Sequence, residues 1–365
     1  LPSFPAETTL PIRDRDGEIS FSFTGWDKTI TLAKRDTTYY ARYKGVVDKP
    51  EVTGETLTYN GAPQSPFIAP SDYYTISVQP RVNAGNYTGI QAARVILKTV
   101  AGLSGIEWSD GRTTDLIINW QILPGTIEAP QLVGGTPSLR YNGKVQQVEM
   151  TAYDAEIINV VGLSAKDVER YEVAISLKTT NYTWEDGTTE PKTAVWFITK
   201  ANLTIQVTDE DKIYDGLPFE YDGNIATSPH LLFEGFLGED SRTSGAVVGV
   251  LKFTGSAFGA RNAGNYIIEI DDTSVVTSNN YNLIYKTGNL KIIKKTDTVK
   301  PGLTETEFEY KGENINIVEY LDDYFDANIM ALSEDVTRMD VGGYSVTVTL
   351  DSNYTWKDDE EQNAF

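Results

Sequence analysis

The residue types that most often carry enzyme chemistry are scarce in this sequence. It contains no cysteine and a single histidine among 365 residues. Thiolate nucleophiles, disulfides and cysteine zinc sites are therefore excluded. A serine–histidine–aspartate triad would have to use His230, whose surroundings, SPHLLFEG, contain no nucleophile elbow. We interpret His230 as a loop or strand-end residue and expect a chain that is not an enzyme.

Clusters of acidic residues are the next candidates for a functional site, because carboxylates bind calcium and act in pairs in glycosidases. The segment IRDRDG places Ile12 at the first ligand position of an EF-hand loop, so it fails that pattern. An irregular calcium site at Asp209, Glu210 and Asp211 stays open as a candidate. No acid pair stands apart from the repeats described below, so glycosidase chemistry has no candidate pair. We expect no cofactor, with calcium as the one alternative.

Exposed tyrosines are candidates for binding glycans, because aromatic faces stack on sugar rings. The candidates lie outside the recurring motifs, and they are Tyr39, Tyr40, Tyr73 and Tyr74. Adjacent residues of a strand point to opposite faces, so one tyrosine of each pair should be exposed even without a ligand.

Four sequons of the N-glycosylation type are present. Their asparagines are Asn86, Asn181, Asn202 and Asn353. Three of the sequons read Asn-Tyr-Thr because repeated motifs contain these residues. If the source is bacterial, eukaryotic-type glycosylation is not expected, and asparagine is favoured in turns. We therefore expect these asparagines to have structural roles in turns.

The charge of the chain excludes further classes of partner. Its 31 basic and 52 acidic side chains give a net charge of −21. Such a chain repels phosphate backbones and anionic lipids, so we expect neither nucleic-acid binding nor membrane contact. No apolar run approaches the roughly 18 to 20 residues of a transmembrane helix. The first residues, LPSFPAETTL, do not form an export signal, so we expect any such signal to be cleaved or outside this sequence.

Internal repeats determine the expected architecture. A tyrosine precedes a glycine turn in LTYNG, LRYNG, KIYDG and FEYKG, and the four are Tyr59, Tyr141, Tyr214 and Tyr310. They are spaced 82, 73 and 96 residues apart. A second marker, NAGNY, occurs at 83–87 and 262–266, and DVGGY follows at 340–344. The corresponding segment of the second repeat is DVERY, with Arg170 in place of the glycine.

A third marker contains two tryptophans that are 12 residues apart. IEWSDGRTTDLIINW (106–120) aligns with YTWEDGTTEPKTAVW (182–196), and NYTWKDDEEQ (353–362) begins the same motif. The Asp-Gly pair between the tryptophans predicts a hairpin or tight connection at Asp186 and Gly187, with Trp184 and Trp196 buried. The recurring aromatic residues should form the structural core, and they are Tyr59, Trp108, Trp120, Tyr141, Trp184, Trp196, Tyr214, Tyr310 and Trp356.

These markers divide the chain into segments of an all-β protein. We expect a remnant of a preceding β module at 1–47 and repeats at 48–127, 128–205, 206–296 and 297–365, the last without its final strand. Short alternating runs between Gly, Asn, Asp and Pro predict an elongated tandem array of small Ig-like β-sandwich domains. A β-grasp-like fold stays open, because period-two alternation fits both. The best helix candidate is 163–171, with Ser164 as N-cap.

The combination of Tyr-Asn/Asp-Gly, NAGNY and the Trp-x-Asp-Gly-Thr-Thr…Trp motif resembles tandem β-domains of large surface proteins from Gram-positive gut bacteria. The third repeat, which contains KIYDGLPFEYDG but no tryptophan, is similar to repeats of the YDG or MBG type. Residues 23–45, FTGWDKTITLAKRDTTYYARYKG, resemble the end of the Listeria–Bacteroides type β-grasp repeat of internalin-like proteins. That last resemblance implies Trp26 as a core residue.

The resemblance implies an extracellular place at a bacterial cell surface, with wall attachment through regions outside this sequence. It implies no activity, because such repeats occur in many different surface proteins. We expect a stalk or adhesin segment, monomeric within a longer chain, whose ligand would be a host glycan or protein. The alternative is a carbohydrate- or host-protein-binding module in its own right.

Overall fold

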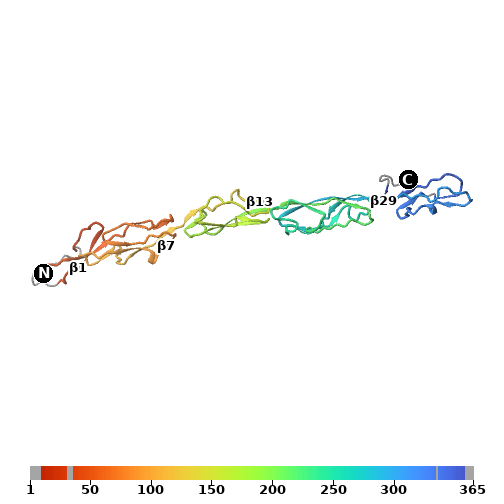
Figure 1. Cartoon of the computed structure of the whole chain (residues 1–365). Helices are drawn as coiled ribbons and strands as arrows, with labels where there is room; N and C mark the ends of the chain where they lie inside the picture. The colour runs from red at the N-terminus through yellow and green to blue at the C-terminus, as the bar shows by residue number, and fades with distance from the viewer. Residues whose placement is uncertain (1–9, 31–35, 334–335, 358–365) are drawn as a thin grey trace. The chain divides into compact units, whose positions relative to one another are not determined.

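A computed structural model describes residues 10–30, 36–333 and 336–357. The described chain is almost entirely strands and turns (Figure 1), which confirms the predicted all-β class. Its helical elements are two short 3-10 helices, η2 (Gly89–Gln91) and η3 (Ile317–Tyr320), and the described residues form no α-helix. Parts of the predicted segments 1–47 and 297–365 lie outside the described residues.

The chain divides into two compact units. The first comprises Leu1–Gly135, Glu149–Leu163 and Glu172–Ala194. The second comprises Thr136–Val148, Ser164–Tyr171 and Val195–Phe365. Both units contain parts of the second predicted repeat, so the compact units are not individual repeats.

The N-terminal strands share a core with the first repeat. Strands β1 (Ile19–Trp26) and β2 (Ala41–Val47) pair antiparallel, and β2 pairs in parallel with β9 (Ile106–Trp108). A second sheet has the order β10-β8-β6, and its strands are β6 (Tyr74–Ser77), β8 (Ala93–Leu97) and β10 (Leu116–Ile118). Between them lies a cluster of buried side chains that includes Ile19, Val47, Ile68, Tyr74, Val95 and Trp108. The described part of 1–47 therefore packs as one body with the repeat that follows it.

One arrangement of three strands recurs in the first three repeats. In the first repeat, β11 (Trp120–Leu123) lies between a parallel neighbour, β4 (Thr56–Thr58), and an antiparallel neighbour, β7 (Gly85–Tyr87). In the third repeat, β28 (Gly288–Ile293) lies between β21 (Glu210–Ile213) and β25 (Gly264–Ile270) with the same directions. We call β11 and β28 central strands.

The central strand of the second repeat is β19 (Lys192–Thr199). Its parallel neighbour is β13 (Ser138–Arg140). On its other side, the N–H of Ile198 donates to the carbonyl of Glu169, directly before β17 (Arg170–Leu177). In β19, Trp196 and Ile198 are buried and the residues between and beside them are more exposed, as a strand with one buried face requires.

Each central strand leads directly into a strand that pairs with the next repeat. The connecting strands are β12 (Gly125–Ile127), β20 (Ala201–Val207) and β29 (Lys295–Thr298). Each pairs in parallel with a strand of the following repeat, and these partners are β18 (Tyr182–Trp184), β27 (Tyr281–Lys286) and β34 (Tyr354–Trp356). The pairing of β2 with β9 has the same form. The boundaries predicted near 48, 128, 206 and 297 fall at the ends of these strands.

The remaining strands are short. They are β3 (Val52–Thr53), β5 (Phe67–Ile68), β14 (Gln146–Gln147), β15 (Ile158–Val161), β16 (Ser164–Ala165), β22 (Leu231–Glu234), β23 (Val248–Val250), β24 (Phe253–Thr254), β26 (Val275–Thr277), β30 (Ile315–Asn316), β31 (Met330–Leu332), β32 (Thr337–Arg338) and β33 (Val348–Leu350).

The helix predicted over 163–171 is wrong. Its expected N-cap, Ser164, lies in β16, which pairs antiparallel with β14. Asp167 and Val168 in the middle of the segment bind a side chain of the third repeat, as described below. These long-range contacts use the polar groups that a helix would have needed, and the weak local preference for helix does not prevail.

Candidate functional site

Asn181 joins the second repeat to the first. Its Oδ1 accepts a hydrogen bond from the N–H of Ala84 at 2.8 Å, and its Nδ2 donates to Oδ1 of Asn83 at 3.2 Å. The Asn181 side chain is buried, so both of its polar atoms need protein partners. This asparagine belongs to a sequon, but its role is to bind the NAGNY loop of the preceding repeat.

Asn353 joins the fourth repeat to the third in the same way. Its Oδ1 accepts from the N–H of Ala263 at 2.6 Å, and its Nδ2 donates to Oδ1 of Asn262 at 3.3 Å. Asn353 is also buried. The expectation that these sequon asparagines serve in local turns is therefore incomplete, because their side chains make contacts about 90 residues away in sequence.

Asn280 forms the third joint, between the third repeat and the second. Its Oδ1 accepts from the N–H of Val168 at 2.9 Å, and its Nδ2 donates to Oδ1 of Asp167 at 3.0 Å. The sequence here reads Asn-Tyr-Asn instead of Asn-Tyr-Thr, and DVERY replaces NAGNY. The bonding pattern is nevertheless the same, because it needs only an asparagine, one backbone N–H and one side-chain oxygen.

The tyrosine after each of these asparagines meets the tyrosine of the preceding Tyr-x-Gly turn. The two rings lie edge to face in all three pairs, a favoured arrangement of aromatic side chains. The pairs are Tyr59 with Tyr182 (5.2 Å between centroids), Tyr141 with Tyr281 (5.5 Å) and Tyr214 with Tyr354 (5.4 Å). We call each set of asparagine, bound loop and tyrosine pair a junction clamp.

A further tyrosine closes the loop that each clamp binds. Its hydroxyl donates to the carbonyl oxygen four residues earlier, from Tyr171 to Asp167 at 2.7 Å and from Tyr266 to Asn262 at 2.8 Å. Tyr87 donates to Asn83 in the same manner. The loop is thus fixed by a bond within its own repeat, so the N–H that meets the asparagine is already in position.

The middle clamp carries an additional acid. Both Tyr141 and Tyr281 donate from their hydroxyls to Oδ2 of Asp240 at 2.7 Å. The hydroxyl of Tyr281 also accepts from the N–H of Leu237 at 2.9 Å. Burial, followed by the hydrogen bond to Asp240, raises the pKa of Tyr281 to about 12. The same two causes raise the pKa of Tyr141 still further.

Two glycines allow the backbones of the second and third repeats to approach at this clamp. A Cβ on Gly143 would lie 2.5 Å from the carbonyl carbon of Leu237, and one on Gly238 would lie 2.6 Å from the carbonyl oxygen of Gly143. Gly143 also has φ +75, in the left-handed region that favours glycine. At this clamp the Tyr-x-Gly motif therefore supplies both an aromatic ring and a close backbone contact.

The two-tryptophan motifs form core anchors. Nε1 of Trp184 donates to the carbonyl of Glu190 at 2.8 Å, and Nε1 of Trp108 donates to that of Thr114 at 3.0 Å. Trp184 and Trp196 are 1% and 0% exposed, which confirms their predicted burial. Their connection is tight but is not a hairpin, because β18 pairs with β12 whereas β19 pairs with β13.

The predicted core residues differ in burial. Six are buried, namely Trp108, Trp120, Tyr141, Trp184, Trp196 and Trp356, and three are half-buried, namely Trp26, Tyr59 and Tyr214. The expectation of a core position for Tyr310 is wrong, because this side chain is 61% exposed. Its three counterparts each pack against the tyrosine of a following repeat, and no such ring lies against Tyr310 among the described residues.

The three acids proposed for calcium do not converge on one point. Oδ1 of Asp209 accepts from the N–H and Nδ2 of Asn289, at 2.7 and 3.0 Å. Glu210 instead interacts with Thr208 and, at 2.8 Å, with Nδ1 of His230. Burial opposes ionisation of Glu210, but these two hydrogen bonds outweigh it and lower its pKa. Asp211 is exposed, and the described residues contain no group of three or more metal-ligating side chains.

The four tyrosines proposed for glycan binding do not form a platform. Tyr74 is 5% exposed, and its hydroxyl donates a hydrogen bond to the carbonyl of Ala69. The expectation that Tyr74 is available to a glycan is therefore wrong. Tyr73 is half-buried and packs against the cluster that contains Ile19 and Trp108. Tyr39 is half-buried and packs against Trp26. Tyr40 alone of the four is exposed. Adjacent residues of a strand point to opposite faces, which explains most of the difference in exposure within each pair.

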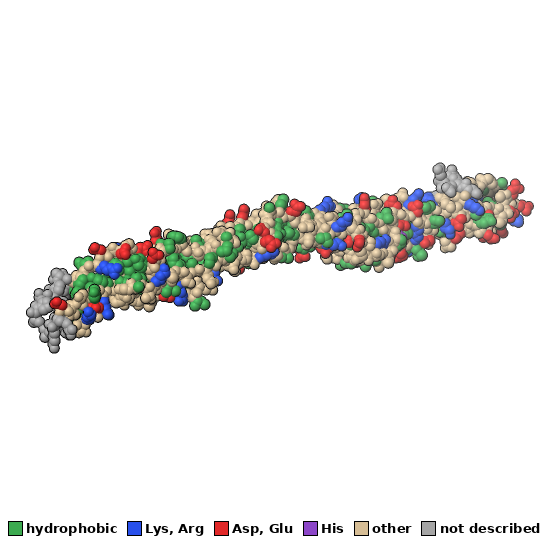
Figure 2. All heavy atoms as spheres, turned by 60° about the vertical axis from the view of Figure 1, so that its left-hand side comes forward, with side chains coloured by type: hydrophobic (Ala, Val, Ile, Leu, Met, Phe, Trp, Pro, Cys, Tyr) green, Lys and Arg blue, Asp and Glu red, His purple; other side chains and the backbone are tan. Residues whose placement is uncertain are grey.

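The surface carries mixed charge. Acidic, basic and apolar side chains are interspersed over the face shown in Figure 2. Within the described ranges, no helix is long and apolar enough to span a membrane. No known family model matches the chain, and no curated protein matches it.

Proposed function

We propose that this chain is a non-catalytic stalk or adhesin segment of a bacterial cell-surface protein, built from tandem Ig-like or β-grasp-like repeats. The observation that supports the proposal most is the recurrence of the junction clamp. The same donor, acceptor and ring contacts occur at Asn181, Asn280 and Asn353. A chain selected only for separate binding domains would not need the same buried contacts at three successive joints.

The clamps suit a chain that bears load. Each connecting strand enters the following repeat already paired with a neighbouring strand, so a pull along the chain acts on several hydrogen bonds together. The asparagine side chain adds two bonds between the repeats, each contributing about 1 kcal/mol. The edge-to-face tyrosine pair adds roughly 0.5 to 1.5 kcal/mol beyond the area that it buries.

The proposed place at the cell surface rests on composition and on the resemblance of the repeats. The absence of cysteine fits a stalk that obtains its stability from packing and joints instead of disulfides. A partner would be a host glycan or protein bound by this segment or by neighbouring domains. The four tyrosines give no support to the alternative of a separate glycan-binding module.

Single-molecule stretching of the full chain tests this function. The chain has no native cysteine, so one cysteine added near each end gives unambiguous attachment points. We expect successive unfolding events that each release a repeat, lengthening the chain by about 3.6 Å per residue freed. Unfolding without measurable force would contradict the stalk, and tight glycan binding by the chain on an array would favour the alternative of a binding module.

A further inference from the structure

The sequence contains two Asn-Gly pairs, and both lie in Tyr-x-Gly turns. They are Asn60-Gly61 in the first repeat and Asn142-Gly143 in the second. An Asn-Gly pair can rearrange without an enzyme, because glycine has no Cβ to shield its backbone nitrogen from the preceding side chain. The same motif in two repeats allows the reactivity of two turns to be compared within one molecule.

In this rearrangement the backbone nitrogen of the glycine attacks Cγ, the side-chain carbonyl carbon of the asparagine. A new N–Cγ bond forms, the Cγ–Nδ2 bond breaks, and ammonia leaves with the proton that the glycine nitrogen gives up. The product is a cyclic succinimide. Water then adds to one of its carbonyl carbons and opens the ring, which leaves an aspartyl or an isoaspartyl residue. No oxidation or reduction takes place.

The two turns have the same local structure. The N–H of Tyr59 donates to the carbonyl of Leu123, the last residue of its central strand, at 2.8 Å. The N–H of Tyr141 donates in the same way to Thr199 at 2.8 Å. Each asparagine Oδ1 accepts from the N–H two residues later, at 2.9 Å in both turns. Local geometry therefore gives the two asparagines the same starting point for the reaction.

The surroundings of the two glycines differ. Asn60 and Gly61 are exposed, and nothing described lies within 4 Å of a Cβ added to Gly61. Residues 60–63 make no backbone–backbone hydrogen bond within the described ranges. The backbone between Asn60 and Gly61 can therefore rotate until the glycine nitrogen faces Cγ, without displacing another segment.

Gly143 is buried against the third repeat. A Cβ added to Gly143 would lie 2.5 Å from the carbonyl carbon of Leu237 and 2.6 Å from the backbone nitrogen of Gly238. The ring just before this turn, Tyr141, donates its hydroxyl to Asp240 of the same loop. Rotation at Gly143 would drive the turn into that loop, so the middle clamp must open before the succinimide can form.

We infer that Asn60 is a site of spontaneous deamidation and isoaspartate formation in the folded chain, with water as the co-reactant, and that the middle clamp protects Asn142. An isoaspartyl residue carries the main chain through its Cβ, which lengthens the turn directly after Tyr59. The ring of Tyr59 belongs to the first clamp. The first joint therefore changes chemically with age, whereas the second joint is protected. This chemistry goes beyond the proposed function and does not depend on it.

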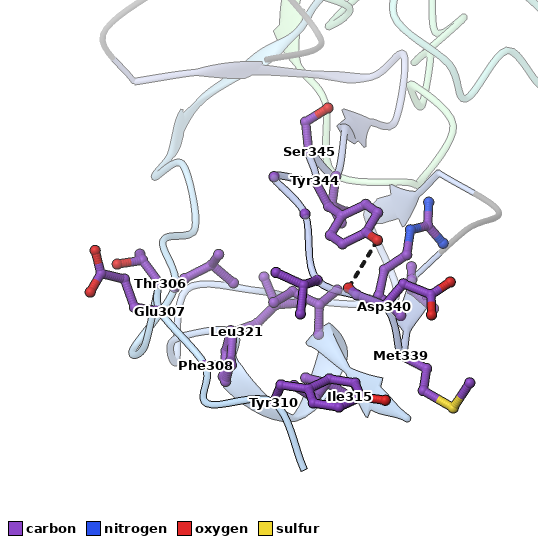
Figure 3. Close-up of a pocket in the computed structure, with 18 of the residues that line it drawn as sticks. Thr306, Glu307, Phe308, Tyr310, Ile315, Leu321, Met339, Asp340, Tyr344 and Ser345 are labelled. Atoms are coloured by element: carbon purple, nitrogen blue, oxygen red, sulfur yellow. Dashed lines mark hydrogen bonds between the residues drawn. The ribbon is translucent and has the colours of Figure 1, made fainter. Parts of the chain in front are cut away.

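The other two Tyr-x-Gly turns carry no side-chain amide at this position. The third repeat has Asp215, whose Oδ1 accepts from the N–H of Leu217 at 2.9 Å. Asn60 makes the same bond, so the aspartyl product fits the turn and the longer isoaspartyl product is the one that distorts it. The fourth repeat has Lys311, directly after Tyr310, which Figure 3 shows among the side chains that line an open groove.

Peptide mapping of the full chain by mass spectrometry measures both sites at once. The chain is incubated in a mildly alkaline buffer, which favours loss of the glycine amide proton, and is then digested in acid. We expect the amide of Asn60 to be replaced by a carboxyl group, with isoaspartate detected by enzymatic methylation. Asn142 should react at least about tenfold more slowly, the factor that an added barrier of about 1.4 kcal/mol gives.

The matched control is the chain unfolded in denaturant, because both sites then read Tyr-Asn-Gly without tertiary contacts. We expect similar rates at the two sites in that state. Tyr281→Phe is the second control, since it keeps the ring but removes the hydroxyl that binds Asp240 and Leu237. In this variant the rate at Asn142 should rise, and the rate at Asn60 should stay the same.

Equal rates at Asn60 and Asn142 in the folded chain would overturn the inference. It would also be overturned if folded Asn60 stayed intact over the time in which the unfolded chain reacts. A difference between the sites that persisted in denaturant would belong to the neighbouring residues in sequence, and the clamp would then have no protective role. An equal rise at both sites in Tyr281→Phe would likewise count against protection by the clamp.

Discussion

The side chain of Asn181 accepts a hydrogen bond from the backbone N–H of Ala84, although 97 residues separate them in sequence. The same relationship joins Asn280 to Val168 and Asn353 to Ala263. Each pair links one repeat to the one before it, and each asparagine precedes a tyrosine whose ring meets the preceding Tyr-x-Gly turn. The joints are therefore a property of the repeat and not of one position.

Asn181→Ala should weaken the first joint. Truncation leaves the N–H of Ala84 without its acceptor, and an unsatisfied donor of this kind costs about 1 to 3 kcal/mol. Hydrogen exchange of the loop at 83–87 measures the effect, and we expect faster exchange than in the unmodified chain. Asn202→Ala is the control, because this sequon asparagine is exposed in β20. Equal exchange in both variants would contradict the role of Asn181.

Trp184→Phe should destabilise the chain more than Trp120→Phe. Nε1 of Trp184 donates to the carbonyl of Glu190. Nε1 of Trp120 is buried, and it has no hydrogen-bond partner among the described residues. Both changes remove a similar volume, so the difference should be about the 1 kcal/mol of one hydrogen bond. Thermal unfolding of the two variants measures it, and a lower melting temperature for Trp120→Phe would refute the prediction.

Alkaline pH should loosen the middle clamp. The pKa of Tyr281 rises from 10.0 to about 12 because of burial and its bond to Asp240, so folding favours the neutral phenol. This contribution to stability is complete below about pH 10 and is lost as the pH rises towards 12.

Denaturant unfolding between about pH 10 and pH 12, followed alongside tyrosinate absorbance, measures the loss of stability. Tyr281→Phe cannot ionise at this position, so its stability should fall less steeply over the same range. An identical fall of the unfolding free energy with pH in the two proteins would show that Tyr281 does not contribute to the pH dependence of stability.

Gly143→Ala should be more harmful than Gly187→Ala. Both glycines have positive φ, +75 and +79, so an alanine costs about 1 to 2 kcal/mol at either position. Only at Gly143 would the new Cβ also collide with the backbone of Leu237. We expect Gly143→Ala to lower the melting temperature further, and equal shifts would mean that the close contact between the backbones is unimportant.

Local sequence patterns predicted much of the scaffold. The Asp-Gly turn between Trp184 and Trp196 and the burial of both indoles follow from turn chemistry and from a motif that occurs twice. The all-β class follows from short runs with period-two alternation. The helix expected at Ser164 failed because its local signal was weak and long-range contacts at Asp167 and Val168 outweighed it.

The sequence by itself determined the existence of the repeats, their turn residues and their buried aromatic anchors, because these depend on neighbours close in the chain. Only the tertiary structure decided the partners of the recurring residues. Asn181 could have capped its own turn, and nothing near Tyr141 in the sequence shows that its ring meets that of Tyr281. Whether a side chain finds a partner some 90 residues away depends on how strands pair across repeats, and local alternation and turn propensity carry no information about that pairing.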